Sequence, residues 1–259
     1  SSSESFDKKK YPVLITIVFF LITAYISFFH HGFWTIFDQD GLFYLSAGRQ
    51  IIVGVGENVS LLNAGPAGPV LFASLESVLK DGLFSIKIIS LLSGTGIVFF
   101  SYMVFKNIFS TKIALVGQLF IAFNPWLGIL STSPLNDLLP IFMSILSFYF
   151  ITKKDIKLTD VIFSASILGI AFMFRAQPII FLFAIIVFLI ILEKKPRFKI
   201  SAVTLLIVFF VLCCSPMLLY NYTVHDKMID SNSNYYVAVH SKYYTQEWKD
   251  FLLDNMDKD

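Results

Sequence analysis

Seven apolar runs separated by short polar segments constrain the fold of this chain more than any other feature. Of its 259 residues, 56% are hydrophobic and 15% are charged, which is far more apolar than a soluble domain. A membrane-spanning helix needs about 20 apolar residues, so we expect an all-α polytopic membrane protein with about seven transmembrane helices surrounded by lipid. The runs cover residues 11–29, 83–105, 113–124, 135–151, 161–174, 179–192 and 200–220.

The basic residues indicate how these runs thread the membrane. They gather before the first run and after the second, fourth and sixth, at Lys8–Lys10, Lys106 and Lys112, Lys153–Lys157, and Lys194–Lys199. Lysine and arginine concentrate in cytoplasmic loops, so an even number of spans should separate successive clusters. We therefore expect a cytoplasmic N-terminus and an outer C-terminal tail, in the plasma membrane of a prokaryote.

This topology divides the chain into three segments. Residues 1–10 are a cytoplasmic tip, residues 11–220 are the transmembrane module, and residues 221–259 are an external segment that begins a truncated or separate external domain. The first external loop, 30–82, is long enough to be structured. Its pattern predicts an interfacial helix over 41–55, with Asp40 at its N-terminus, and a short helix over 70–79.

Two carboxylates, Asp38 and Asp40, stand where the first apolar run meets water. A carboxylate at the rim of a bilayer is costly unless it has a task. With His30 and His31, these two residues are also ligand types that suit a divalent cation, so a metal site at Asp38 and Asp40 is an open alternative. No other cofactor is indicated, and a net charge of +2 argues against nucleic acid as a partner.

The order of motifs along the chain resembles that of the GT-C glycosyltransferases. Asp40-x-x-x-Tyr44-x-x-x-Gly48-Arg49 follows the first run, a Gly/Pro knot at 65–69 opens a short helix, and Asp137 begins a later run. The branch it resembles most holds the aminoarabinose transferase and the protein O-mannosyltransferases. This resemblance implies a seven-span module that moves a sugar, with inversion, from a polyprenyl or dolichyl phosphate to a glycan, lipid or protein acceptor on the outer face.

The resemblance and the chemistry together suggest roles for single residues. Asp40, four residues before Tyr44, matches the catalytic carboxylate of the family, and Asp137 matches an acidic residue that faces the active-site cavity. The alternative for Asp137 is a helix-capping carboxylate. A guanidinium binds phosphate oxygens bidentately, so Arg175 is the first candidate for the donor phosphate, with a snorkelling cation as the alternative. Arg49 and Tyr44 are further candidates for binding the donor.

A second class of function stays open. Many relatives carry a lysine before the prolines of the knot, where this chain has Asn63-Ala64-Gly65-Pro66, and they usually continue well beyond the seventh span. The chain is therefore either a glycosyltransferase or a catalytically silent membrane subunit that binds partner membrane proteins. Carboxylates at the membrane rim favour the enzyme, because a scaffold gains nothing from them.

Overall fold

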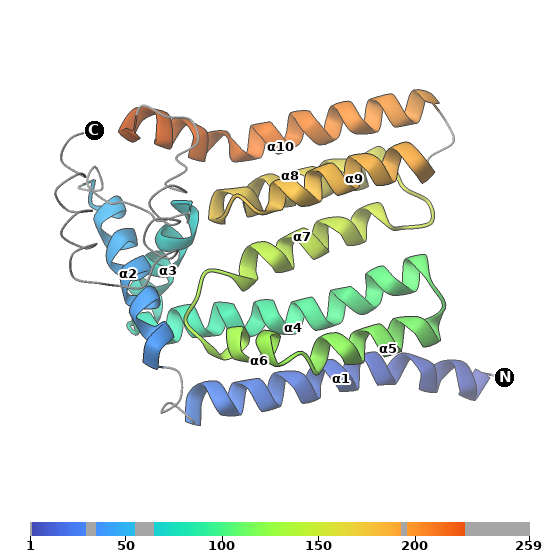
Figure 1. The fold of residues 1–259 in the computed structure, drawn as a ribbon, viewed down its shortest axis with the longest axis horizontal. Coiled ribbons are helices and arrows are strands. Elements are labelled where there is room, and N and C mark those ends of the chain that lie inside the picture. Colours follow the sequence, from blue (N-terminus) through green and yellow to red (C-terminus); the bar gives the residue numbers. More distant parts are fainter. Residues whose placement is uncertain (1, 30–34, 55–64, 193–195, 226–259) are drawn as a thin grey trace, which may run out of the picture.

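The computed structural model describes residues 2–29, 35–54, 65–192 and 196–225, and its regular elements are helices. The helices that lie side by side in Figure 1 are α1 (Ser2–Phe29), α4 (Gly82–Ile108), α5 (Thr111–Ala122), α7 (Leu138–Ile151), α8 (Leu158–Phe174), α9 (Pro178–Leu192) and α10 (Pro196–His225). The short α6 (Pro125–Thr132) continues α5 after a bend of 57°. The expected all-α polytopic membrane architecture is confirmed.

Three of the described helices, α1, α4 and α10, are long and apolar enough to cross a membrane. A fourth span results if α5 and α6 are one broken helix, while α7, α8 and α9 are apolar but shorter. With the bent pair counted once, the described ranges make seven passes in the order that the sequence predicts. That all seven cross the bilayer stays a prediction.

Helix ends differ from the predicted ends in several places, and α1 begins at Ser2, ahead of the run that starts at residue 11. The last helix, α10, continues to His225, beyond the apolar run that ends at residue 220. The first helix of the external loop, α2 (Thr35–Ile52), begins upstream of the two carboxylates. The prediction that Asp40 lies at a helix N-terminus is therefore wrong, since Asp40 lies in the second turn of α2. The rest of the predicted external segment, 226–259, lies outside the described residues.

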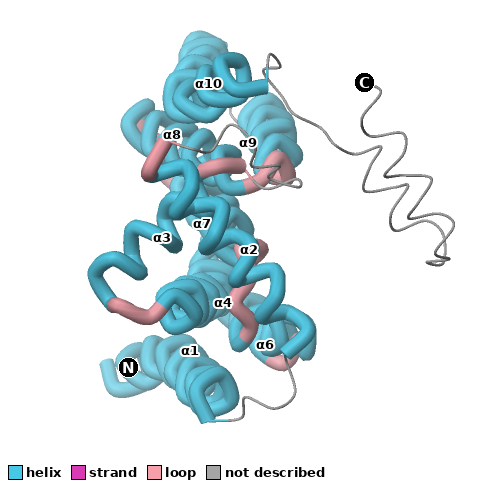
Figure 2. The backbone as a smooth tube through the Cα atoms, turned by 90° about the vertical axis from the view of Figure 1, so that its left-hand side faces the viewer, coloured by secondary structure: helices cyan, strands magenta, loops and turns pink. Residues whose placement is uncertain are grey.

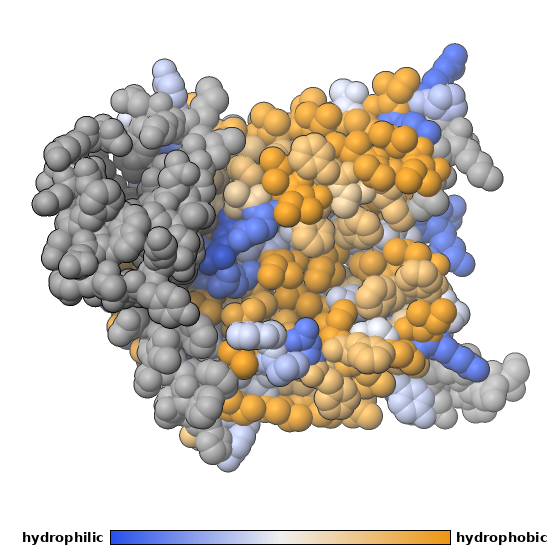
Figure 3. Space-filling view, viewed as in Figure 1, coloured by the Kyte–Doolittle hydropathy of each residue, from blue (hydrophilic) through white to orange (hydrophobic). Residues whose placement is uncertain are grey.

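The two ends of the helical layer differ in kind. The α4–α5 and α7–α8 turns and the start of α10 lie together at one end, on the right in Figure 1, and Figure 3 shows hydrophilic residues there beside an apolar band. At the other end, α2 and α3 (Ala67–Leu79) lie across the ends of the passes, as Figure 2 shows. The described residues of the basic clusters thus share one end, as the predicted topology expects.

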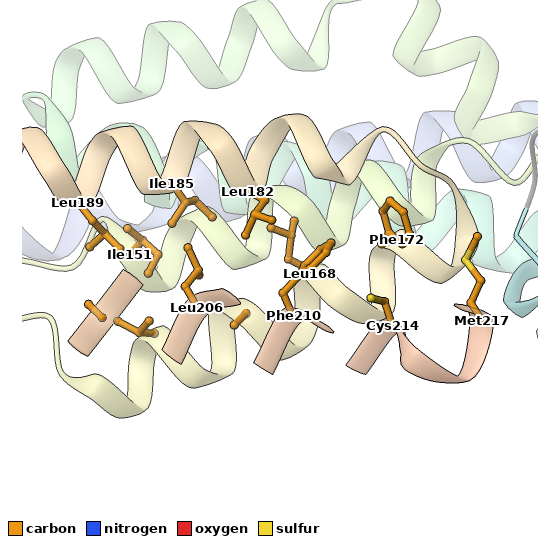
Figure 4. Packing of buried hydrophobic residues seen from close by; sticks show 13 residues of the cluster. Ile151, Leu168, Phe172, Leu182, Ile185, Leu189, Leu206, Phe210, Cys214 and Met217 are labelled. Atoms are coloured by element: carbon orange, nitrogen blue, oxygen red, sulfur yellow. The ribbon is translucent and has the colours of Figure 1, made fainter. Parts of the chain in front are cut away.

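Two apolar clusters hold the passes together. The larger joins α7, α8, α9 and α10, and Figure 4 shows Leu168, Leu182, Ile185, Leu206 and Phe210 meeting within it. The smaller joins α1, α4, α6 and α7, and contact between α4 and α7 links the two halves. Because lipid is as apolar as these side chains, close packing and buried polar contacts carry the specificity. One such contact is the 2.8 Å hydrogen bond between Ser147 of α7 and Ser164 of α8.

Candidate functional site

The Gly/Pro knot before α3 is anchored to the end of α8. The Gly65 N–H donates to the Phe174 carbonyl over 3.0 Å, and the Asn136 side-chain amide donates to the same oxygen over 3.2 Å. A Cβ added at Gly65 would lie 1.8 Å from the Met173 carbonyl oxygen, so the close approach requires glycine. The residue before Asp137 and the residue before Arg175 are thereby held together.

Helix α2 packs on the place where the knot, the end of α8 and the start of α7 meet, which we call the junction. Its Tyr44 and Leu45 are buried in a cluster with Phe72 of α3 and Ile86 of α4. A Cβ added at Gly41 would lie 2.7 Å from the carbonyl oxygen of Pro134, three residues before Asp137. The first external loop therefore places its second helical turn against the segment that leads into α7.

An ion pair forms the centre of the junction. Arg175, which follows α8, places its Nη1 2.5 Å from Asp137 Oδ1 at the start of α7. Arg175 Nη2 donates a longer hydrogen bond, 3.4 Å, to the hydroxyl of Tyr44. The two charged side chains are 21% and 25% exposed, so neither is sealed off. Asp137 makes no side-chain cap hydrogen bond to α7, so the capping alternative does not describe it. The snorkelling alternative for Arg175 stays open.

A small pocket opens beside this ion pair. It has a volume of about 120 Å³ and is lined by Asp137, Pro140, Ile141, Ser144, Arg175 and Phe181, among others. That volume equals roughly four waters' share of the liquid, enough for a compact polar group. One wall carries the ion pair and the other is formed by apolar side chains of α7 and α9. Arg175 Nε is buried without a hydrogen-bond partner in the described part of the chain, so donor capacity remains on this guanidinium.

Of the predicted site residues, the structure brings Tyr44, Asp137 and Arg175 together. Arg49 instead pairs with Glu76 of α3, and its Nε donates to Glu76 Oε2 over 2.8 Å. The hydrogen bond from Arg49 is the main cause that lowers the pKa of the Glu76 carboxyl. Because Arg49 is 60% exposed, this pair ties α2 to α3 at the surface and contributes little stability.

The side chains of Asp38 and Asp40 lie outside the described residues, although α2 holds Asp40 one turn before Tyr44. The described residues contain no group of three or more His, Cys, Asp or Glu side chains that could hold a metal ion. The alternative of a metal at Asp38 and Asp40, with His30 and His31, falls outside that part of the chain and stays a prediction.

Sequence reasoning missed Asn136, which is fully buried and holds the Phe174 carbonyl. Its place next to Asp137 was the one feature that could have pointed to it. That signal is weak, because polar residues are common at the start of a span. Asn136→Ala removes the donor and opens space beside Gly68, so we expect a loss of about 1–3 kcal/mol in stability. Thermal unfolding in detergent measures it, with exposed Gln50→Ala as the control. Equal midpoints for the two variants would contradict this role.

Comparison with known proteins identifies a family for the segment that contains the junction. No curated protein and no solved structure matches the chain. Residues 63–220, which include the knot, Asp137 and Arg175, match the model of a family described as dolichyl-phosphate-mannose-protein mannosyltransferase. Asp40 and Tyr44 precede the matched residues, which make up more than half of the chain. The chain therefore belongs to this family of GT-C type membrane glycosyltransferases.

Proposed function

We propose that this chain transfers a sugar from a dolichyl or polyprenyl phosphate to an acceptor on the outer face of the membrane, with inversion. The observation that carries the proposal is the pocket beside the partly exposed Arg175–Asp137 pair, in a chain of this family. A lipid phosphate gains negative charge as the sugar departs. A guanidinium held beside it stabilises that charge most where water is scarce.

Arg175 is held in a way that suits this task. Its contacts with Asp137 and Tyr44 fix the guanidinium before any ligand arrives, so little ordering remains to be done on binding. The apolar wall of the pocket, with Ile141 and Phe181, offers contact for the first carbons of the lipid chain. The site thus combines a cation with an apolar surface, which matches the two halves of a lipid phosphate.

Asp40 is the proposed base. Its neighbour Gly41 contacts the segment that leads to Asp137, so this turn of α2 lies beside the phosphate site. As the acceptor hydroxyl forms its bond to the anomeric carbon, its proton passes to the carboxylate. The bond from that carbon to the phosphate oxygen breaks on the opposite face, which gives inversion, and the lipid phosphate leaves beside Arg175.

A catalytically silent subunit that binds partner membrane proteins is the second candidate. One observation favours it: Asp137 pairs directly with Arg175, and a scaffold would keep such a pair to hold α7 against α8. Reconstituted protein incubated with mannosyl, glucosyl and aminoarabinosyl lipid phosphates separates the two candidates. Consumption of at least one donor, most of all the mannosyl donor, supports the enzyme. No consumption alongside normal folding would support the silent subunit.

The membrane orientation gives a separate prediction. In a protein with Cys213 and Cys214 replaced by alanine, single cysteines at Asn58 and Asn232 should react with an impermeant thiol reagent in intact cells. A cysteine at Lys154 should stay unlabelled, because lysine clusters concentrate in the cytoplasm. Labelling is compared before and after permeabilisation, which exposes all three positions. Reaction at Lys154 with none at Asn232 in intact cells would reverse the proposed orientation.

A further inference from the structure

We propose that the basic end of the helical layer, opposite the Arg175 junction, holds a binding site for an acidic phospholipid. A pocket of about 370 Å³ lies there between the end of α4, the α7–α8 turn and α9. Its polar lining consists of Asn107, Thr152, Lys153 and Lys154, and Phe188 of α9 closes its apolar side. None of these residues belongs to the proposed catalytic site.

The polar half of the pocket offers one lysine without an ion pair among the described residues, Lys154, beside the Asn107 amide, which donates to the Thr152 hydroxyl over 3.2 Å. Lys153 Nζ lies 2.6 Å from Asp160 Oδ1 and 4.5 Å from the centroid of the Phe150 ring, so its position is fixed and its charge is offset. Burial opposes ionisation of Asp160, yet hydrogen bonds from Lys153 and from the Lys157 backbone keep the pKa of this carboxyl below its ordinary value. Lys154 is exposed and forms no ion pair with the described residues, so its charge is available to a ligand.

An apolar groove lies next to this pocket, along α7 and α9. It has a volume of about 500 Å³, and only apolar residues line it: Phe148, Phe183, Ala184, Val187, Phe188 and Ile191. Phe188 lines both spaces, so the polar pocket and the groove adjoin at this side chain. Figure 4 shows Leu182, Ile185 and Leu189 of α9 inside the α7–α10 cluster, and the exposed Val187 and Ile191 belong to the other side of this helix.

The polar pocket and the apolar groove together indicate which class of ligand binds. An acyl chain fills an apolar groove, and a phosphate accepts hydrogen bonds from lysine and amide donors. Basic pockets at the membrane surface, between spanning helices, recognise acidic head groups in this way. A zwitterionic lipid would bring its own cation next to Lys154, and a further spanning helix would leave the polar pocket unfilled. An acidic phospholipid satisfies both halves at once.

Binding of phosphatidylglycerol and phosphatidylcholine to the purified protein, measured by native mass spectrometry, tests this site. We expect selective retention of phosphatidylglycerol and a loss of affinity of roughly fivefold in Lys154→Gln, as one lysine near a lipid surface contributes. Lys112→Gln is the matched control, because it removes a charge at the same end outside the pocket. Ala184→Trp should displace the lipid by filling the groove, whereas Ile190→Trp, on exposed α9 surface outside the groove, should not.

Two results would overturn the proposal. The first is equal retention of the two lipids by the wild-type protein. The second is an equal loss in Lys154→Gln and Lys112→Gln, which would mean that the basic end attracts acidic lipids without a specific pocket. Lys154 and Lys112 are both exposed, so neither substitution disturbs packing. Either outcome can therefore be interpreted even if Ala184→Trp folds poorly.

Discussion

Asp40→Asn is expected to lower the rate of sugar transfer by roughly 10²- to 10⁴-fold, the range for loss of a general base. Asparagine keeps the size of the side chain but has no basicity at neutral pH, so the acceptor hydroxyl can no longer pass its proton to this position. Donor binding should change little, because the proposed phosphate contact is Arg175. The rate is measured as release of lipid phosphate from a mannosyl donor by reconstituted protein.

Asp38→Asn is the matched control for this prediction. It removes the neighbouring carboxylate from the same helix and should reduce the rate much less. Both variants should unfold at temperatures near that of the wild type. Full activity in Asp40→Asn would end the assignment of Asp40 as the base, and an equal loss in the two variants would point to a shared task such as metal binding.

Arg175→Ala should weaken donor binding and slow transfer by about 10²- to 10³-fold, as removal of a donor to developing negative charge typically does. Arg175→Lys should recover only part of this loss. An ammonium restores the charge but not the fork of N–H groups that binds two phosphate oxygens. Arg49→Ala serves as the control, because that guanidinium pairs with Glu76 at the surface.

The ion pair between Arg175 and Asp137 gives this substitution a second effect. Arg175→Ala leaves the partly buried Asp137 carboxylate without its partner, which destabilises the fold independently of any donor. The double variant Arg175→Ala, Asp137→Asn removes that unpaired charge. We expect the double variant to regain stability while donor affinity stays low. Recovery of donor affinity together with stability would show that Arg175 has a structural task only.

The sequence predicts the passes well because hydrophobicity alone defines them. It predicts helix ends less well: helix α2 starts at Thr35, upstream of the carboxylates, and no apolar pattern reports this. The bend between α5 and α6 is another such case, since the short apolar run ending near Asn124 does not show that a further helix follows.

For the site, the types of residue were predictable and their pairing was not. Asp137 and Arg175 could be chosen because a carboxylate at the membrane rim is costly and a guanidinium suits a phosphate. Their contact with each other, and that of Arg175 with Tyr44, joins segments up to 131 residues apart and depends on how α7, α8 and α2 pack. Arg49 was also expected to bind the donor phosphate, but in the structure it pairs with Glu76 on the adjoining helix α3.

A cryo-electron microscopy structure with a non-transferable analogue of a mannosyl lipid phosphate tests the central claim most directly. We expect the phosphate within hydrogen-bonding distance of the Arg175 guanidinium, the start of the lipid chain against Ile141 and Phe181, and the sugar turned toward the Asp40 turn of α2. A phosphate bound elsewhere, with the Arg175–Asp137 pair unchanged and distant from the ligand, would contradict the proposed site.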